Sequence, residues 1–159
     1  MSDVIELIHH NCSRIKVLTL GRKDWIVTKI DMVRLSLLPE LQELTIAKIR
    51  KYANAASFEG VSMMRELVSL SVPIGGIHVW QIMDLLPCKL RRLTVQLGVQ
   101  GSCAPLLERL AFHPNNVLEE LFVKTLTRTN RAAIETLASL YPALQVLKMD
   151  CTPSTCTRE

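Results

Sequence analysis

The segment Leu38-Pro39-Glu40-Leu41-Gln42-Glu43-Leu44-Thr45-Ile46 decides the fold, because its pattern L-x-x-L-x-L recurs along the chain. Apolar residues at alternate positions predict a short β-strand with one buried face. With Ile, Val or Met also allowed, the pattern occurs six times, and its central leucines are Leu18, Leu44, Leu70, Leu93, Leu121 and Leu147. Their spacings are 26, 26, 23, 28 and 26 residues. Chance matches would not stay in phase in this way, so we expect an internal repeat.

The segments between these strands carry the apolar spacing of amphipathic helices. The expected inner faces are Ile26, Ile30, Val33 and Leu37; Val79, Ile82, Met83 and Leu86; Cys103, Leu106, Leu107 and Leu110; and Ala133, Ile134, Leu137 and Leu140. Gly60 interrupts residues 50–64, where we expect a short or irregular helix. At the start of the chain, Val4, Leu7 and Ile8 are expected to cover part of the first repeat. Strands alternating with helices predict an α/β fold.

Two phrases, Leu38 to Ile46 and Tyr141-Pro142-Ala143-Leu144-Gln145-Val146-Leu147-Lys148-Met149, resemble the leucine-rich-repeat superfamily. The form P-x-L-x-x-L-x-L is similar to the cysteine-containing repeats common in F-box proteins. The resemblance covers about residues 3–151 and implies a solenoid of about six repeats, with a parallel concave sheet and outer helices. We expect one leucine-rich-repeat domain over residues 1–151 and a disordered polar tail over 152–159. The Asn or Cys usual in that subclass is replaced by Lys23, Ile49, Gly75, Gly98, Leu126 and Thr152.

Composition disfavours several classes of protein. The net charge is only +4, from 19 basic and 15 acidic residues, which disfavours a nucleic-acid partner. The chain has no secretory signal pattern and no run of eighteen apolar residues, so no membrane association is expected. Its five cysteines are odd in number and form no C-x-x-C pair, which favours reduced thiols. We therefore expect a cytoplasmic or nuclear protein.

The motifs of catalysis and cofactor binding were not found in the sequence. His9, His10 and Cys12 lie close together, but a second pair at zinc-site spacing is lacking. There is no G-x-S-x-G turn and no glycine-rich phosphate loop. We expect no enzyme activity, no catalytic residue, no metal and no cofactor. The densest basic residues fit either a site for phosphate or an acidic peptide, or an ordinary solvated edge; they are Lys48, Arg50, Lys51, Arg91 and Arg92.

One candidate site comes from the residue between the last two leucines of each pattern, which points to the opposite face of the sheet. That position holds Thr19, Thr45, Ser71, Thr94, Phe122 and Lys148. A single exposed aromatic after four small hydroxyl residues, with charged neighbours around it, is typical of an interface hot spot. The predicted partner-binding residues are Arg92, Thr94, Gln96, Glu120, Phe122 and Lys124. The alternative is that Phe122 covers a neighbouring gap or is itself covered by a continuation of the chain.

The sequence therefore predicts a non-catalytic module that binds a protein on its concave face. The resemblance implies a narrower role, substrate recognition for an F-box-type ubiquitin ligase, although no F-box is recognisable in the chain. The alternative is a structural assembly factor or subunit that binds through the ends of the solenoid in a larger complex. Both ends are poorly capped, so self-association through them is also expected.

Overall fold

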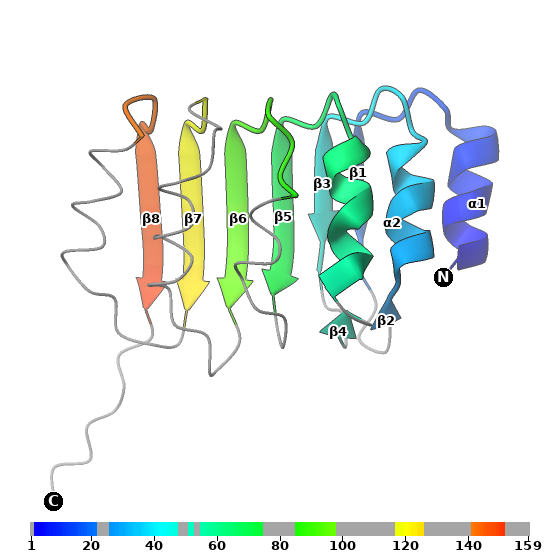
Figure 1. The fold of residues 1–159 in the computed structure, drawn as a ribbon, viewed down its shortest axis with the longest axis horizontal. Helices are drawn as coiled ribbons and strands as arrows, with labels where there is room; N and C mark the ends of the chain where they lie inside the picture. The colour runs from blue at the N-terminus through cyan, green and yellow to red at the C-terminus, as the bar shows by residue number, and fades with distance from the viewer. Residues whose placement is uncertain are drawn as a thin grey trace, which may run out of the picture.

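Six parallel strands form the main sheet, and each contains the central leucine of one predicted pattern (Figure 1). The computed structural model describes residues 2–21, 26–47, 51–52, 55–74, 85–97, 117–125 and 141–151. The strands are β1 (Val17–Leu20), β3 (Glu43–Ile46), β5 (Ser69–Ile74), β6 (Arg92–Leu97), β7 (Glu120–Thr125) and β8 (Val146–Cys151). Their order in the open sheet, β1-β3-β5-β6-β7-β8, is their order in the chain. The predicted α/β class and parallel sheet are confirmed.

The strands pair in one continuous register. Leu18 lies beside Leu44, and the same alignment continues through the central leucines to Leu147. Each junction repeats one hydrogen-bond arrangement just before the strand: at the first, the amides of Gln42 and Glu43 both donate to the Lys16 carbonyl at 2.9 Å. The carbonyls that accept two amides in this way are those of Lys16, Gln42, Val68, Arg91 and Glu119. The register is therefore set at the turn that enters each strand.

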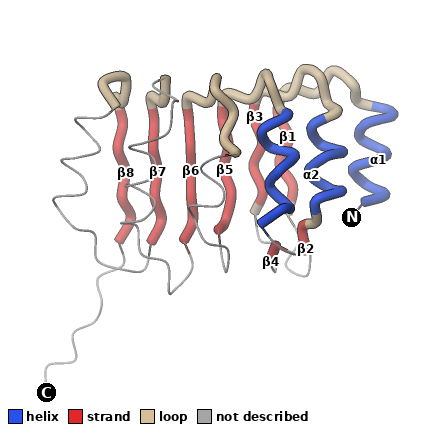
Figure 2. Tube along the Cα trace, in the orientation of Figure 1, coloured by secondary structure: helices blue, strands red, loops and turns tan. Residues whose placement is uncertain are grey.

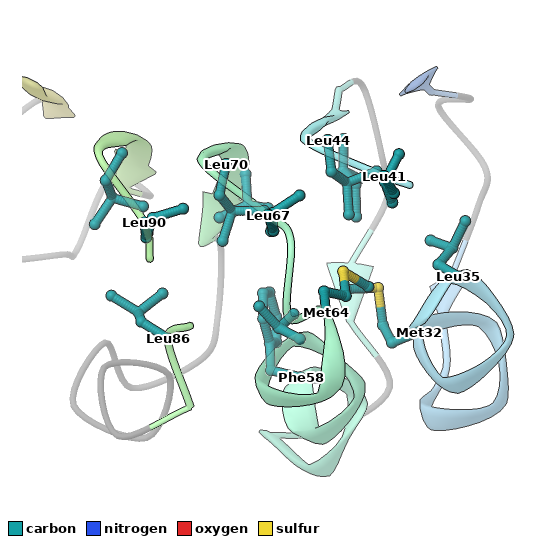
Figure 3. Close-up of a cluster of buried hydrophobic side chains, with 14 of the residues drawn as sticks. Met32, Leu35, Leu41, Leu44, Phe58, Met64, Leu67, Leu70, Leu86 and Leu90 are labelled. Carbon is teal, nitrogen blue, oxygen red and sulfur yellow. The ribbon is translucent and has the colours of Figure 1, made fainter. Parts of the chain in front are cut away.

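The core lies on one side of this sheet, against the helices (Figure 3). The leucine positions of the strands are buried there, with Leu44, Leu70 and Leu93 each only 1% exposed. Met32 and Leu35 from one helix and Phe58 from another complete this core, and all three are fully buried. The alternate residues of each strand lie on the opposite face, as strand geometry requires.

Three helices cover the β1 end of the sheet (Figures 1 and 2). They are α1 (Ser2–Asn11), α2 (Lys29–Ser36) and the 3₁₀ helix η1 (Ala55–Met63), and α2 contacts both of the others. The 3₁₀ helix confirms the short or irregular helix expected in residues 50–64. None of the helices in the described ranges is long and apolar enough to cross a membrane.

The prediction that Ile26 belongs to the inner face of a helix is wrong, and the buried face of that helix also differs from the prediction. Thr28 caps α2 in a capping box with Asp31: the Thr28 amide donates to Asp31 Oδ2 at 2.9 Å, and the Asp31 amide donates to Thr28 Oγ1 at 3.3 Å. The helix therefore begins at Lys29. The preceding pair of residues forms β2 (Ile26–Val27), which pairs in parallel with β4 (Lys51–Tyr52).

The buried face of α2 consists of Met32 and Leu35, together with Asp31. The predicted face included Ile30 and Leu37, which are 62% and 53% exposed. Two apolar stripes exist on this short segment, and packing against η1 selects the other one.

The inner face of α1 also differs from the prediction. Ile5 is fully buried and Ile8 packs against the core, whereas Val4 and Leu7 are 46% and 62% exposed. Glu6 lies beside α2, where its carboxylate is 3.5 Å from the Arg34 guanidinium. The burial of Ile5 and Ile8 sets the rotation of α1, and the ion pair is compatible with it. The helices predicted around residues 79–86, 103–110 and 133–140, and the tail at 152–159, lie outside the described residues.

Candidate functional site

The face of the sheet opposite the core, here called the exposed sheet face, carries its side chains in rows that cross all six strands. The first row holds the residue before each central leucine: Val17, Glu43, Ser69, Arg92, Glu120 and Val146. The second row holds the residue after it: Thr19, Thr45, Ser71, Thr94, Phe122 and Lys148. The second row is the one predicted from the sequence, and the strand register confirms it.

The structure brings the six predicted site residues together on β6 and β7. They form three in-register pairs: Arg92 beside Glu120, Thr94 beside Phe122, and Gln96 beside Lys124. The four charged or amide side chains in this set, Arg92, Gln96, Glu120 and Lys124, are exposed.

The sequence predicted an exposed Phe122 ring, but Phe122 is half-buried in the structure. The Lys124 ammonium lies 5.1 Å from the centre of the ring. This is a cation–π distance. Phe122 also lines a depression.

That depression has a volume of about 210 Å³ and lies across β6, β7 and β8. Its lining residues are Arg92, Leu93, Thr94, Glu120, Leu121, Phe122, Val146 and Lys148. Sites for whole small molecules typically measure about 300–1,000 Å³, so this space suits a side chain better than a cofactor. Val146 and Lys148 were missed from the predicted site, although they occupy the two rows on the next strand and are the in-register neighbours of Glu120 and Phe122.

An ion pair across three strands organises the charges of the face. Arg92 Nη2 lies 2.6 Å from Glu43 Oε1, and the pair spans β5 at Ser69, whose small side chain leaves room for it. Glu43 was not part of the predicted site. The sequence contained a signal for this ion pair, because the first row places the small Ser69 between the opposite charges of Glu43 and Arg92.

Of the basic residues considered for phosphate binding, Arg91 and Arg92 are held by carboxylates, and Lys51 is described only as part of the backbone of β4. Arg91 Nη1 lies 2.8 Å from Glu119 Oε1, and Arg92 is held by Glu43. Lys48 and Arg50 lie outside the described residues. Within the described ranges, neither Glu120 nor Lys148 makes an ion pair. The depression therefore offers one carboxylate and one ammonium to an incoming group.

Residues with chemical reactivity lie away from this depression. Among the described residues, no group of three His, Cys, Asp or Glu side chains is placed to hold a metal ion. The rings of His9 and His10 stand edge to face at 5.6 Å, and the thiols of Cys12 and Cys88 are free and exposed. Burial raises the pKa of Tyr141 to about 12, and this residue lies in the turn before β8.

A second depression, of about 340 Å³, lies where α2 and η1 end. It is lined by Ser36, Leu38, Pro39, Leu41, Met63, Met64, Arg65 and Glu66. Glu66 is held there by Lys89, whose Nζ is 2.8 Å from Glu66 Oε1. Leu38, Leu41 and Met64 in its wall belong to the core, and it contains no predicted site residue.

Comparison of the sequence with known protein families finds no match, and comparison with curated proteins finds none either. The inference of function therefore starts from the rows, the depression and the ion pairs described above.

Proposed function

We propose that the chain is a leucine-rich-repeat solenoid that binds a segment of another protein on its exposed sheet face and performs no catalysis. Support for the solenoid comes from six parallel strands in chain order, spaced by 23 to 28 residues and aligned on their leucines. Solenoids of this kind present long surfaces for partners. The similarity to F-box repeats favours a narrower form of the proposal, in which the bound segment belongs to a substrate of a ubiquitin ligase.

The observation that carries the proposal is the partly accessible Phe122 ring in a side-chain-sized depression. In the second row, strands β1, β3, β5 and β6 carry only Thr or Ser. The part of this row that leads to Phe122 is therefore free of bulky side chains. An extended segment can lie along this row and place one apolar side chain against Phe122 and Val146. Glu120 and Lys148 then orient the segment by accepting from or donating to its polar groups.

Replacement of Phe122 by alanine tests this proposal. Phe122→Ala removes the anchor, and we expect it to weaken binding of a captured protein by about 2 kcal/mol or more, roughly thirtyfold in Kd. The half-buried ring contributes less to the core than the leucines, so thermal stability should change little. Proteins captured by the immobilised chain would be identified by mass spectrometry, and Kd measured for each purified candidate.

The matched control is Leu37→Ala, which removes an exposed apolar side chain at the end of α2, on the helical side of the molecule. It should leave Kd unchanged. A sharp drop in melting temperature for Phe122→Ala with unchanged binding would place Phe122 in the core and overturn the proposed site.

A further inference from the structure

The two edge strands differ from the four inner strands in the first row of the exposed sheet face. The inner strands carry Glu43, Ser69, Arg92 and Glu120 in this row. The edge strands β1 and β8 carry Val17 and Val146, which are 59% and 36% exposed. Edge strands usually carry charges or proline that prevent further pairing. Here both edge strands have a valine in the first row, and β8 carries its charges, Lys148 and Asp150, further along the strand.

The backbone at the two edges is complementary. At each of the five strand junctions, two amides at the start of one strand donate to one carbonyl of the strand before it. β1 has no preceding strand in the described sheet, so the equivalent amides of Lys16 and Val17 face its open edge. β8 has no following strand there, so the equivalent carbonyl of Gln145 faces the opposite edge. For this one arrangement, the β1 edge supplies the two donors and the β8 edge the acceptor, while the rest of each edge exposes both N–H and C=O groups.

Among the described residues, burial of the core is less complete at the β8 end. Leu121 and Val123 on β7 are 1% and 0% exposed, but Leu147 and Met149, which lie beside them on β8, are only half-buried. A further strand with apolar residues at the same two positions would cover them. β1 has that pattern, with Leu18 and Leu20 aligned to the leucine rows.

The β1 end also exposes an apolar side of a helix. Glu6 of α1 contacts Arg34 of α2. Val4 lies two residues away, about 200° around the helix, and so faces away from α2. Its side chain is 46% exposed. The N-terminal end of the molecule thus carries apolar surface in both layers, on α1 and at Val17.

We propose that copies of this chain associate head to tail, with β1 of one copy adding to β8 of the next as a seventh parallel strand. Val17 then lies beside Val146, and the Gln145 carbonyl accepts the amides of Lys16 and Val17. Leu18 and Leu20 cover Leu147 and Met149, and α1 follows onto the β8 end of the core. Each copy uses two different surfaces, so the contact is heterologous. The inference rests on the strand edges and does not require ligand binding at Phe122, although Val146 belongs to both surfaces.

Paired charge substitutions test the arrangement in the full chain. Sedimentation velocity over a concentration series should show reversible association of the unaltered chain. Val17→Lys and Val146→Glu each place a charge against a valine of the neighbouring copy, and each should weaken association by about tenfold or more. An equimolar mixture of the two variants should associate more tightly than either alone, because one type of contact pairs the introduced ammonium with the introduced carboxylate and the other is unaltered.

Leu37→Glu, a charge introduced at an exposed apolar position of α2, should leave the association as it is in the unaltered chain. Circular dichroism melts of all variants check that the fold is retained, which exposed positions should allow. Three results would each overturn the proposal. They are an unaltered chain that stays monomeric at its highest soluble concentration, association that Val17→Lys and Val146→Glu do not weaken, and a mixture that associates no more tightly than its components.

Discussion

Among the described residues, Tyr141 is the one whose ionisation couples most directly to folding. It is 3% exposed, and burial raises its pKa from 10.0 to about 12. Below pH 10 the phenol is neutral in both folded and unfolded chains. Between pH 10 and 12 only the unfolded chain releases this proton, so the stability present below pH 10 is lost as the pH rises through that window.

We therefore expect the free energy of unfolding, measured in urea, to fall steadily across this alkaline range. In Tyr141→Phe the fall should be shallower, because the titrating group is gone. The comparison is between slopes with pH, since the substitution also changes the absolute stability. Equal slopes in the two proteins would show that Tyr141 is not the group responsible.

At the same scale, the sequence predicted the position of Phe122 but not its surroundings. Strand alternation is local, so the row containing Thr94 and Phe122 followed from the leucine pattern alone. The pair between Glu43 and Arg92 depends on the register of three strands and on the small size of Ser69. The contact between Lys124 and the ring depends on the conformations of both side chains. The leucine pattern places Glu43, Ser69 and Arg92 in one row, but whether the charges meet across Ser69 is a tertiary property.

Among the elements, η1 and α2 approach each other closely at Gly60. A Cβ atom placed there would lie 2.5 Å from the carbonyl carbon of Met32 and 2.7 Å from the Val33 nitrogen. These are backbone atoms that a side-chain rotation cannot move. We expect Gly60→Ala to lower the free energy of unfolding by about 1–3 kcal/mol, the usual cost of forcing extra atoms into a packed interior.

Ser62→Ala, at an exposed position of the same helix, provides the comparison in urea denaturation. Ser62→Ala should lower the free energy of unfolding by well under half of the amount expected for Gly60→Ala. If the two variants were equally stable, the contact between the helices would be looser than described.

The elements also show where sequence patterns are informative. The six strands were predictable because their two-residue alternation repeats in phase. The rotation of α2 was not, because Ile30 and Leu37 form one apolar stripe and Met32 and Leu35 another, and only the contact with η1 selects between them. The two-residue strands β2 and β4 are too short to leave any periodicity.

Across the whole molecule, burial falls at the β8 end of the sheet. The inward residues of β7 are fully buried, whereas Leu147 and Met149 of β8 are half-buried. Local opening should therefore cost less free energy at β8 than at β7. Hydrogen exchange measured on dilute, monomeric chain should show faster exchange in residues 146–150 than in residues 120–124. Equal protection of the two strands in the monomer would contradict this gradient.

The complementary edges of the sheet make the molecule polar, because its two ends carry different binding surfaces. A dimer formed through them still has one unpaired β1 edge and one unpaired β8 edge, so association does not end at two copies. The rotation between neighbouring copies would determine the assembly: a rotation that closes gives a ring, and one that does not gives an open filament. Each added copy would also move the depression at Phe122 from the margin of a sheet to the middle of a longer one.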